Sequence, residues 1–121
     1  MNHTPMPEFL SIDRAMEFIG DNQGVLSLLK TLHQTLSEDL PRLQTLLDQG
    51  DVQGANRILH QIKGFTPVFC VDSLVAHVVL IEDMSKHAEA TDLSTAYLLL
   101  APKLETLRQE VLAHMTLHNK A

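Results

Sequence analysis

The sequence has little that suits a secreted or membrane-spanning protein. Its 121 residues include a single cysteine, which excludes an internal disulfide and any cysteine-rich zinc site and is typical of a reducing compartment. No apolar run approaches the roughly 18 residues that span a bilayer, and the first ten residues lack the basic and apolar regions of a signal peptide. We therefore expect a cytoplasmic protein that does not contact membranes.

Basic residues are also scarce. Nine lysines and arginines against fifteen acidic residues give a formal charge of −6, which disfavours nucleic acid as a partner. The chain is 45% hydrophobic and 20% charged, a composition that suits one ordinary core. We expect residues 1–121 to form a single domain, with residues 1–10 flexible and a bundle over about residues 21–118.

The apolar residues recur at spacings of three and four, and no stretch alternates as a strand would, so the predicted fold class is all-α. Ser11 and Gly20 are typical of the two ends of a short helix over residues 12–19. The pattern predicts an antiparallel four-helix bundle with this short N-terminal helix added to it. The four longer helices are expected over residues 22–49, 52–69, 71–85 and 92–115.

Two prolines fall inside these predicted helices. A proline in a helix interior removes one backbone donor and costs about 3 kcal/mol. We therefore expect Pro41 to kink the second helix or break it into two pieces, and Pro102 to bend the first half of the last helix.

The region of chemical interest is a stretch without any acidic residue, 52–71, whose only formal charges are Arg57 and Lys63. The two cations lie three residues on either side of His60, so all three share one face of a helix. The apolar residues of this segment fall on the opposite face. We therefore expect His60 on the solvent side, beside two positive charges.

An imidazole with an ordinary pKa of about 6.5 is mostly neutral at pH 7 and can attack an electrophilic phosphorus. Cations such as Lys63 would steady the phosphoryl oxygens. Gly64 removes a side chain one turn from His60, although glycine costs about 1 kcal/mol relative to alanine in a helix. Access for a bulky partner would explain that cost.

The run His60-Gln61-Ile62-Lys63-Gly64 resembles the H-x-x-K-G core of histidine-containing phosphotransfer (HPt) domains. The resemblance covers about residues 12–85, with the last helix similar only in type. Further positions that match the family pattern are Asp51, Ala55, Leu74, Ile81, Glu82 and the leucine-rich second helix.

The resemblance implies a phosphorelay intermediate without catalytic activity of its own. His60 would accept a phosphoryl group from the aspartyl phosphate of one receiver domain and pass it to the aspartate of another. The partners would be receiver domains of response regulators or hybrid histidine kinases. The receiver would supply Mg²⁺, and this chain would need no cofactor. We expect it to be a free-standing monomer.

The resemblance also implies roles around His60: Lys63 would contact the phosphoryl group or the partner, and Gly64 would allow close approach. From its charge and position, Arg57 either attracts phosphate or helps docking, or is a charge on a solvated helix face. From their position one to two turns beyond His60, we expect Pro67 and Val68 to belong to a small apolar patch on which a receiver docks. Glu82 would hold the imidazole nitrogen that does not react; the alternative, which we favour, is a plain surface acid.

Three positions depart from the family pattern. Phe65 stands where a small residue is usual, and Pro67 interrupts the backbone hydrogen bonds near the helix end. Cys70 stands where a glycine commonly makes the turn into the next helix, and a left-handed conformation is costly for cysteine. We therefore expect distorted last turns in the third helix.

Other interpretations are open to different degrees. His114 and His118 have a spacing that can bind zinc or nickel, but we expect no metal site because histidines also suit the end of a helix. A helical-bundle adaptor that kept the fold and lost the relay is the main alternative. A kinase or hydrolase is disfavoured, because the sequence lacks a Gly-rich phosphate loop and paired catalytic carboxylates.

Overall fold

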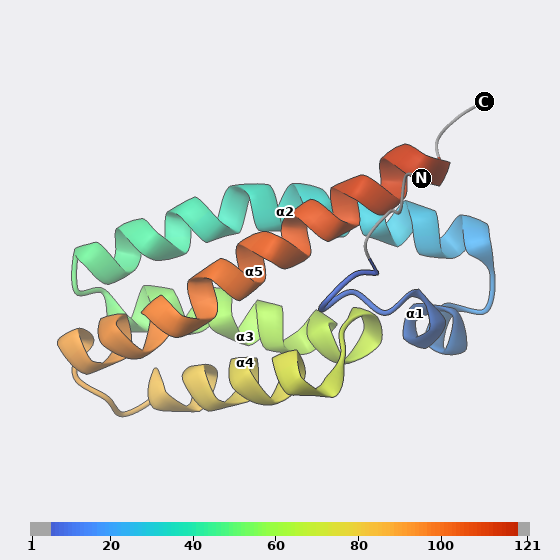
Figure 1. Cartoon of the computed structure of the whole chain (residues 1–121). Helices are drawn as coiled ribbons and strands as arrows, with labels where there is room; N and C mark the ends of the chain where they lie inside the picture. Colours follow the sequence, from blue (N-terminus) through green and yellow to red (C-terminus); the bar gives the residue numbers. More distant parts are fainter. Residues whose placement is uncertain (1–5, 119–121) are drawn as a thin grey trace.

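The computed structural model describes residues 6–118, and this part of the chain is helical, as predicted. The predicted short helix and the four longer ones are all present (Figure 1). Each begins and ends within a few residues of the expected bounds. The helices are α1 (Ile12–Ile19), α2 (Asn22–Asp48), α3 (Val52–Phe69), α4 (Asp72–Met84) and α5 (Ala90–His118).

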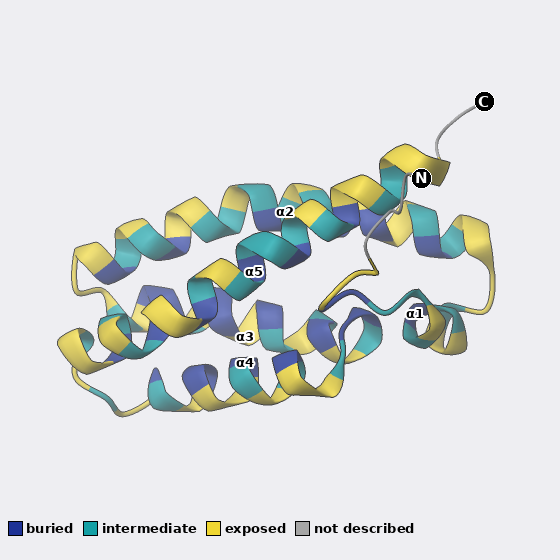
Figure 2. Ribbon diagram, in the orientation of Figure 1, coloured by how far each residue is buried: buried dark blue, intermediate teal, exposed yellow. Residues whose placement is uncertain are grey.

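The four long helices form the bundle, and α1 packs against α2 and α3 at one end (Figure 1). Helix α2 packs along α5, α3 lies between α2 and α4, and α4 returns to α5. The apolar stripe of each helix faces this common interior, as the buried positions in Figure 2 show. Its largest fully buried apolar side chains are leucines and isoleucines: Leu29, Leu36, Leu43, Leu59, Ile62, Leu74, Ile81, Leu93, Leu100, Leu104 and Leu107.

Local residues fix where the first three helices begin. The hydroxyl of Ser11 accepts the Arg14 backbone N–H, and the carboxylates of Asp21 and Asp51 accept backbone N–H groups three residues further on. Each bond satisfies one of the free donors in a first helical turn. At the other end of α1, Gly20 has a left-handed φ of 95°, which a glycine adopts without strain. These predicted caps are confirmed.

The prolines do not divide their helices. Helix α2 runs unbroken through Pro41, α5 through Pro102 and α3 through Pro67. Of the two outcomes expected at Pro41, a kink or a break into two pieces, the break is therefore wrong. On both sides of Pro41, α2 buries leucines, at Leu36 and Leu43, against the rest of the core. This packing holds both parts of α2 in the bundle and offsets the missing backbone hydrogen bond.

A short segment before α1 is fastened to the bundle by one carboxylate. Glu110 on α5 accepts backbone N–H groups from Glu8, Phe9 and Leu10, the last two at 3.0 Å. Phe9 and Leu10 are buried in the core. Hydrogen bonds from backbone N–H groups to a carboxylate are stronger than neutral ones. Glu110 thus holds residues 8–10, part of the stretch expected to be flexible, across the end of the bundle.

The turn between α3 and α4 is completed by this same segment. Cys70 has an extended backbone, with φ −125° and ψ 156°, and pairs with Leu10 in an isolated antiparallel bridge. The Val71 N–H donates to the Phe9 carbonyl at 2.9 Å. The concern that Cys70 would need a left-handed conformation is therefore wrong. Cys70 is fully buried and therefore a core residue, and this burial raises the pKa of its thiol to about 12.

Within residues 6–118, no helix combines the length and the apolar character needed to cross a membrane. Residues 1–5 of the stretch expected to be flexible lie outside the described residues, as do residues 119–121.

The role of Glu110 can be tested by replacing it. Glu110→Ala leaves three backbone N–H groups without their acceptor, so we expect the free energy of unfolding to fall by about 2–3 kcal/mol. Urea denaturation followed by circular dichroism measures this loss. The control is Glu17→Ala, an exposed acid on α1, which should change stability by less than about 0.5 kcal/mol. Equal effects of the two substitutions would show that Glu110 does not fasten the segment.

Candidate functional site

Helix α3 presents His60 to solvent because its apolar residues face the other way. Leu59 and Ile62, on either side of His60 in the sequence, are fully buried between α2 and α4. The side chain of His60 itself is 71% exposed. The predicted position of His60 on the solvent side of the bundle is confirmed.

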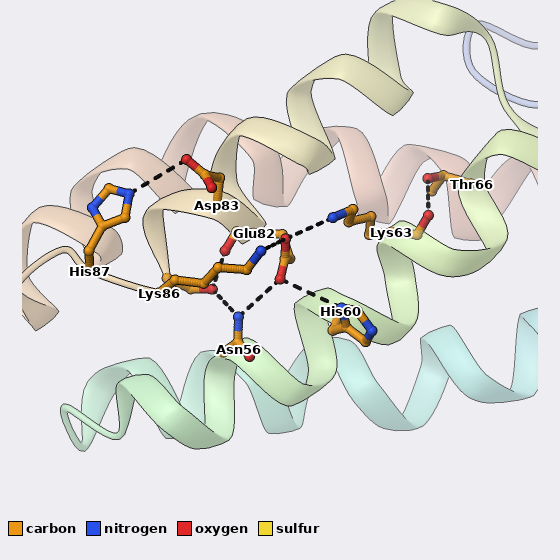
Figure 3. A network of polar contacts seen from close by, with 9 residues as sticks. Asn56, His60, Lys63, Thr66, Glu82, Asp83, Lys86 and His87 are labelled. Atoms are coloured by element: carbon orange, nitrogen blue, oxygen red, sulfur yellow. Dashed lines mark hydrogen bonds and ion pairs between the residues drawn. The ribbon is translucent and has the colours of Figure 1, made fainter.

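A buried carboxylate lies behind the imidazole. Glu82 on α4 is only 1% exposed, and its Oε2 lies 3.6 Å from Nδ1 of His60 (Figure 3). The favoured interpretation of Glu82 as a plain surface acid is therefore wrong. Its neighbours on the same face of α4, Val78 and Ser85, are buried with it. The packing of α4 against α3 carries the carboxylate into the space between them.

Two lysines neutralise this carboxylate. The Nζ of Lys63 lies 3.2 Å from Oε1 of Glu82, and the Nζ of Lys86 lies 3.5 Å from the same oxygen. Figure 3 shows the two side chains reaching Glu82 from opposite sides, Lys63 from α3 and Lys86 from the turn that follows α4. An isolated buried carboxylate is very costly, and pairing it with cations offsets much of that cost.

An amide holds the other oxygen of Glu82. Nδ2 of Asn56 donates to Oε2 at 3.1 Å and also to the hydroxyl of Ser85 at 2.7 Å. That hydroxyl donates in turn to the backbone carbonyl of Glu82. The carboxylate is thus fixed in orientation, with Oε1 toward the lysines and Oε2 toward Asn56 and His60.

These contacts decide the charge of Glu82. Burial acts to raise its pKa, but the hydrogen bonds from Lys63 and Asn56 and the charges of Lys63 and Lys86 outweigh burial and hold the pKa below its ordinary value. At neutral pH the side chain is therefore a carboxylate. It faces His60 as an acceptor with a full negative charge.

The other predicted site residues surround this network without entering it. A methyl group built on Gly64 would meet nothing within 4 Å, so no packing inside residues 6–118 requires a glycine there. Arg57 and Pro67 are exposed on α3, and Arg57 lines a hollow with Asn56 and Lys86. Within the described residues, the structure therefore joins Lys63 and Glu82 to His60 and leaves Arg57, Gly64 and Pro67 on the open surface.

Three residues of the network were not predicted: Asn56, Ser85 and Lys86. Helical spacing carried a signal for two of them. Asn56 lies four residues before His60, and Lys86 lies four residues after Glu82, so each shares a helix face with its partner. The signal for Lys86 becomes informative only once Glu82 is known to be buried.

The two histidines whose spacing suits a metal ion, His114 and His118, lie at the end of α5. Among residues 6–118, no group of three or more histidine, cysteine or acidic side chains is placed to hold a metal ion. The rings of His114 and His118 lie with their centres 4.2 Å apart. Burial and the charge of His118 lower the pKa of His114.

The arrangement defines a class of protein. One exposed imidazole stands on a convex helix face, with a carboxylate behind it and cations beside it, and it can act as a nucleophile toward a group presented by another molecule. The class is a helical bundle with an exposed histidine backed by a buried carboxylate.

The comparison with protein families agrees with this description. The family model named Hpt domain matches residues 27–114, which covers α3, α4, most of α2 and most of α5, and the chain belongs to this family. Hpt domains transfer phosphoryl groups in phosphorelays, interact there with receiver domains, and are phosphocarriers without autonomous enzyme activity. No curated protein and no solved structure matches the chain significantly.

The charge of Glu82 predicts a pH dependence of stability. A carboxyl whose pKa is lower in the folded state stabilises the fold above its unfolded pKa of about 4.5, and this contribution is lost as the pH falls through the folded value. We expect Glu82→Gln to lower the free energy of unfolding by about 1–2 kcal/mol at pH 7. Urea denaturation between pH 3 and pH 7 should show the two proteins converging below about pH 4.5. A difference that does not change with pH would contradict an ionised Glu82.

Proposed function

We propose that His60 accepts a phosphoryl group from an aspartyl phosphate on one receiver domain and passes it to the aspartate of another. The supporting observation is the placement of His60: an exposed imidazole whose Nδ1 faces a buried, ionised carboxylate. All the groups involved lie in one chain, so the proposed reaction needs only a monomer. This monomer would act as one HPt-like domain.

The position of Glu82 assigns roles to the two ring nitrogens. In the neutral imidazole one nitrogen carries the proton and the other a lone pair. A carboxylate near Nδ1 favours the proton there, which leaves the lone pair on Nε2 as the nucleophile. The separation of 3.6 Å is slightly longer than a hydrogen bond, and the exposed ring is free to rotate and shorten it.

In each step of the transfer one bond to phosphorus forms and one breaks. The Nε2 lone pair attacks the phosphorus, the new N–P bond forms, and the P–O bond to the receiver's aspartate breaks, which releases a carboxylate. The imidazole ring becomes positively charged, and the negative charge of Glu82 stabilises it. In the next step the aspartate of a second receiver attacks the same phosphorus, and His60 returns to its neutral form. Mg²⁺ for both steps belongs to the receiver.

The surface around His60 suits an acidic partner that presents a phosphoryl group. Helix α3 has no acidic residue, and Arg57 and Lys63 flank His60 along it. In this proposal Lys63 contacts the phosphoryl oxygens, and Arg57 contributes positive charge to docking. Gly64 leaves room for the partner's backbone, and Pro67, exposed further along α3, contributes apolar contact area together with Val68.

The direct test uses a panel of phosphorylated receiver domains, presented to the wild type and to His60→Gln. Label that is labile in acid and stable in base, on the wild type alone, is the expected result. The variant should fold normally because His60 is exposed, and circular dichroism checks this. A folded wild type that takes no label from any receiver would favour the adaptor interpretation over the relay.

Gly64 offers a second test, in which stability and function should move in opposite directions. Because a methyl group at Gly64 meets nothing in the fold, Gly64→Ala should raise the free energy of unfolding by up to about 1 kcal/mol. The same methyl group occupies the space expected for the receiver, so phosphotransfer should slow by about tenfold or more. Urea denaturation and transfer kinetics with one receiver measure the two effects.

The matched control is Gln53→Ala, an exposed position about two turns before His60 on the same helix. It should leave the transfer rate within about twofold, since surface substitutions away from a site have small effects. Unchanged transfer by the stabilised Gly64→Ala variant would show that Gly64 does not serve partner approach.

A further inference from the structure

Glu82 is paired with more positive charge than its own negative charge requires. One carboxylate carries one negative charge, yet the ammonium groups of Lys63 and Lys86 both approach the same oxygen, Oε1, at 3.2 and 3.5 Å. Two positive charges so close to one another repel. A single lysine would be sufficient to neutralise the buried carboxylate, so the presence of the second one calls for a reason.

The two lysines differ in what else they can reach. Lys63 lies one turn from His60 on the same helix, and its side chain is 36% exposed. Lys86 lies in the turn just after α4, four residues beyond Glu82, and its side chain is 52% exposed. Figure 3 shows Lys63 on the His60 side of the carboxylate. Lys63 is thus the one placed to leave Glu82 for a group bound on the imidazole, while Lys86 stays.

We propose that Lys86 is a positioning residue, a second counter-ion that keeps Glu82 ionised and directed at His60 when Lys63 turns to the phosphoryl group. The proposal rests on the proposed function of His60. Asn56 completes the arrangement, because its hydrogen bond at 3.1 Å holds Oε2 in place whichever lysine occupies Oε1.

The physical need for such a residue arises when the phosphoryl group arrives. The group carries up to two negative charges and competes with Glu82 for the ammonium of Lys63. A carboxylate that is 1% exposed and loses its only cation takes up a proton or keeps the cation. Either outcome harms transfer: the first removes the charge behind His60, and the second removes Lys63 from the phosphoryl group. With Lys86 present, neither occurs.

The first part of the test needs no phosphorylation. The variants are Lys63→Met, Lys86→Met and the double variant, with Lys30→Met, an exposed lysine on α2, as the control. If either lysine alone can neutralise Glu82, each single variant should lower the folding equilibrium constant by less than about threefold. The double variant should lower it at least about tenfold more than the product of the two single-variant effects. Simple additivity of the two effects, measured by urea denaturation, would overturn the proposal.

The second part of the test measures which ring nitrogen of His60 carries the proton. In ¹⁵N spectra of His60, the proton should stay on Nδ1 in both single variants and lose that preference in the double variant. In a Glu82→Gln background, Lys63→Met and Lys86→Met should no longer alter these signals, alone or together. Persistent effects in that background would mean that Lys86 acts on His60 through space, and would overturn a role through Glu82.

The third part uses the phosphorylated protein. At equilibrium with a labelled receiver, Lys86→Met should lower the share of label on His60 by about two- to fivefold, and Lys30→Met should not. An unchanged share in Lys86→Met would overturn the proposal. Absence of label on the wild type would instead refute the relay function, while the denaturation cycle and the imidazole signals would still decide whether the two lysines substitute for one another.

Discussion

A single negative charge placed out of reach of water governs the whole site. Glu82 is almost completely buried, and it stays ionised only because α3 and α4 bring cations and an amide to it. These contacts have two effects. They neutralise the carboxylate, and they link α3, which carries His60, to α4, so that the carboxylate is held beside the imidazole.

A second carboxylate, that of Glu110, binds backbone N–H groups and, within residues 6–118, no cations. Glu110 gathers three backbone N–H groups of residues 8–10, and those residues close the turn at Cys70 where α3 passes into α4. The family match begins at residue 27, so this segment and α1 lie outside it. The segment is fastened to the end of α3, the helix that carries His60.

Much of the fold could be predicted because it depends on local patterns. The spacing of leucines places the helices, and Ser11, Asp21 and Asp51 mark where three of them begin. The exposure of His60 follows from the same periodicity. The extended turn at Cys70 could not be predicted, because it depends on pairing with Leu10, sixty residues away in the chain. The same holds for the continuity of α2 through Pro41, which depends on packing against other helices.

Glu82 shows why the site was only partly predictable. Leu74, Val78 and Glu82 follow one another at spacings of four, so the periodicity that buries the first two also points Glu82 inward. The charge of the side chain argued against burial, since glutamate is rarely buried unless it is paired. Its partners Lys63 and Asn56 come from another helix, and that pairing appears only once α3 and α4 are packed together.

The exposed position of His60 has a consequence for the relay proposed above. One nitrogen on one helix face would admit one receiver at a time, because the donor and the acceptor would have to cover the same surface. The two receivers would then exclude each other, and this chain would release the first before it binds the second, as in a ping-pong scheme. The flux of signal would therefore depend on the amount of phosphorylated protein and on how quickly each receiver dissociates from it.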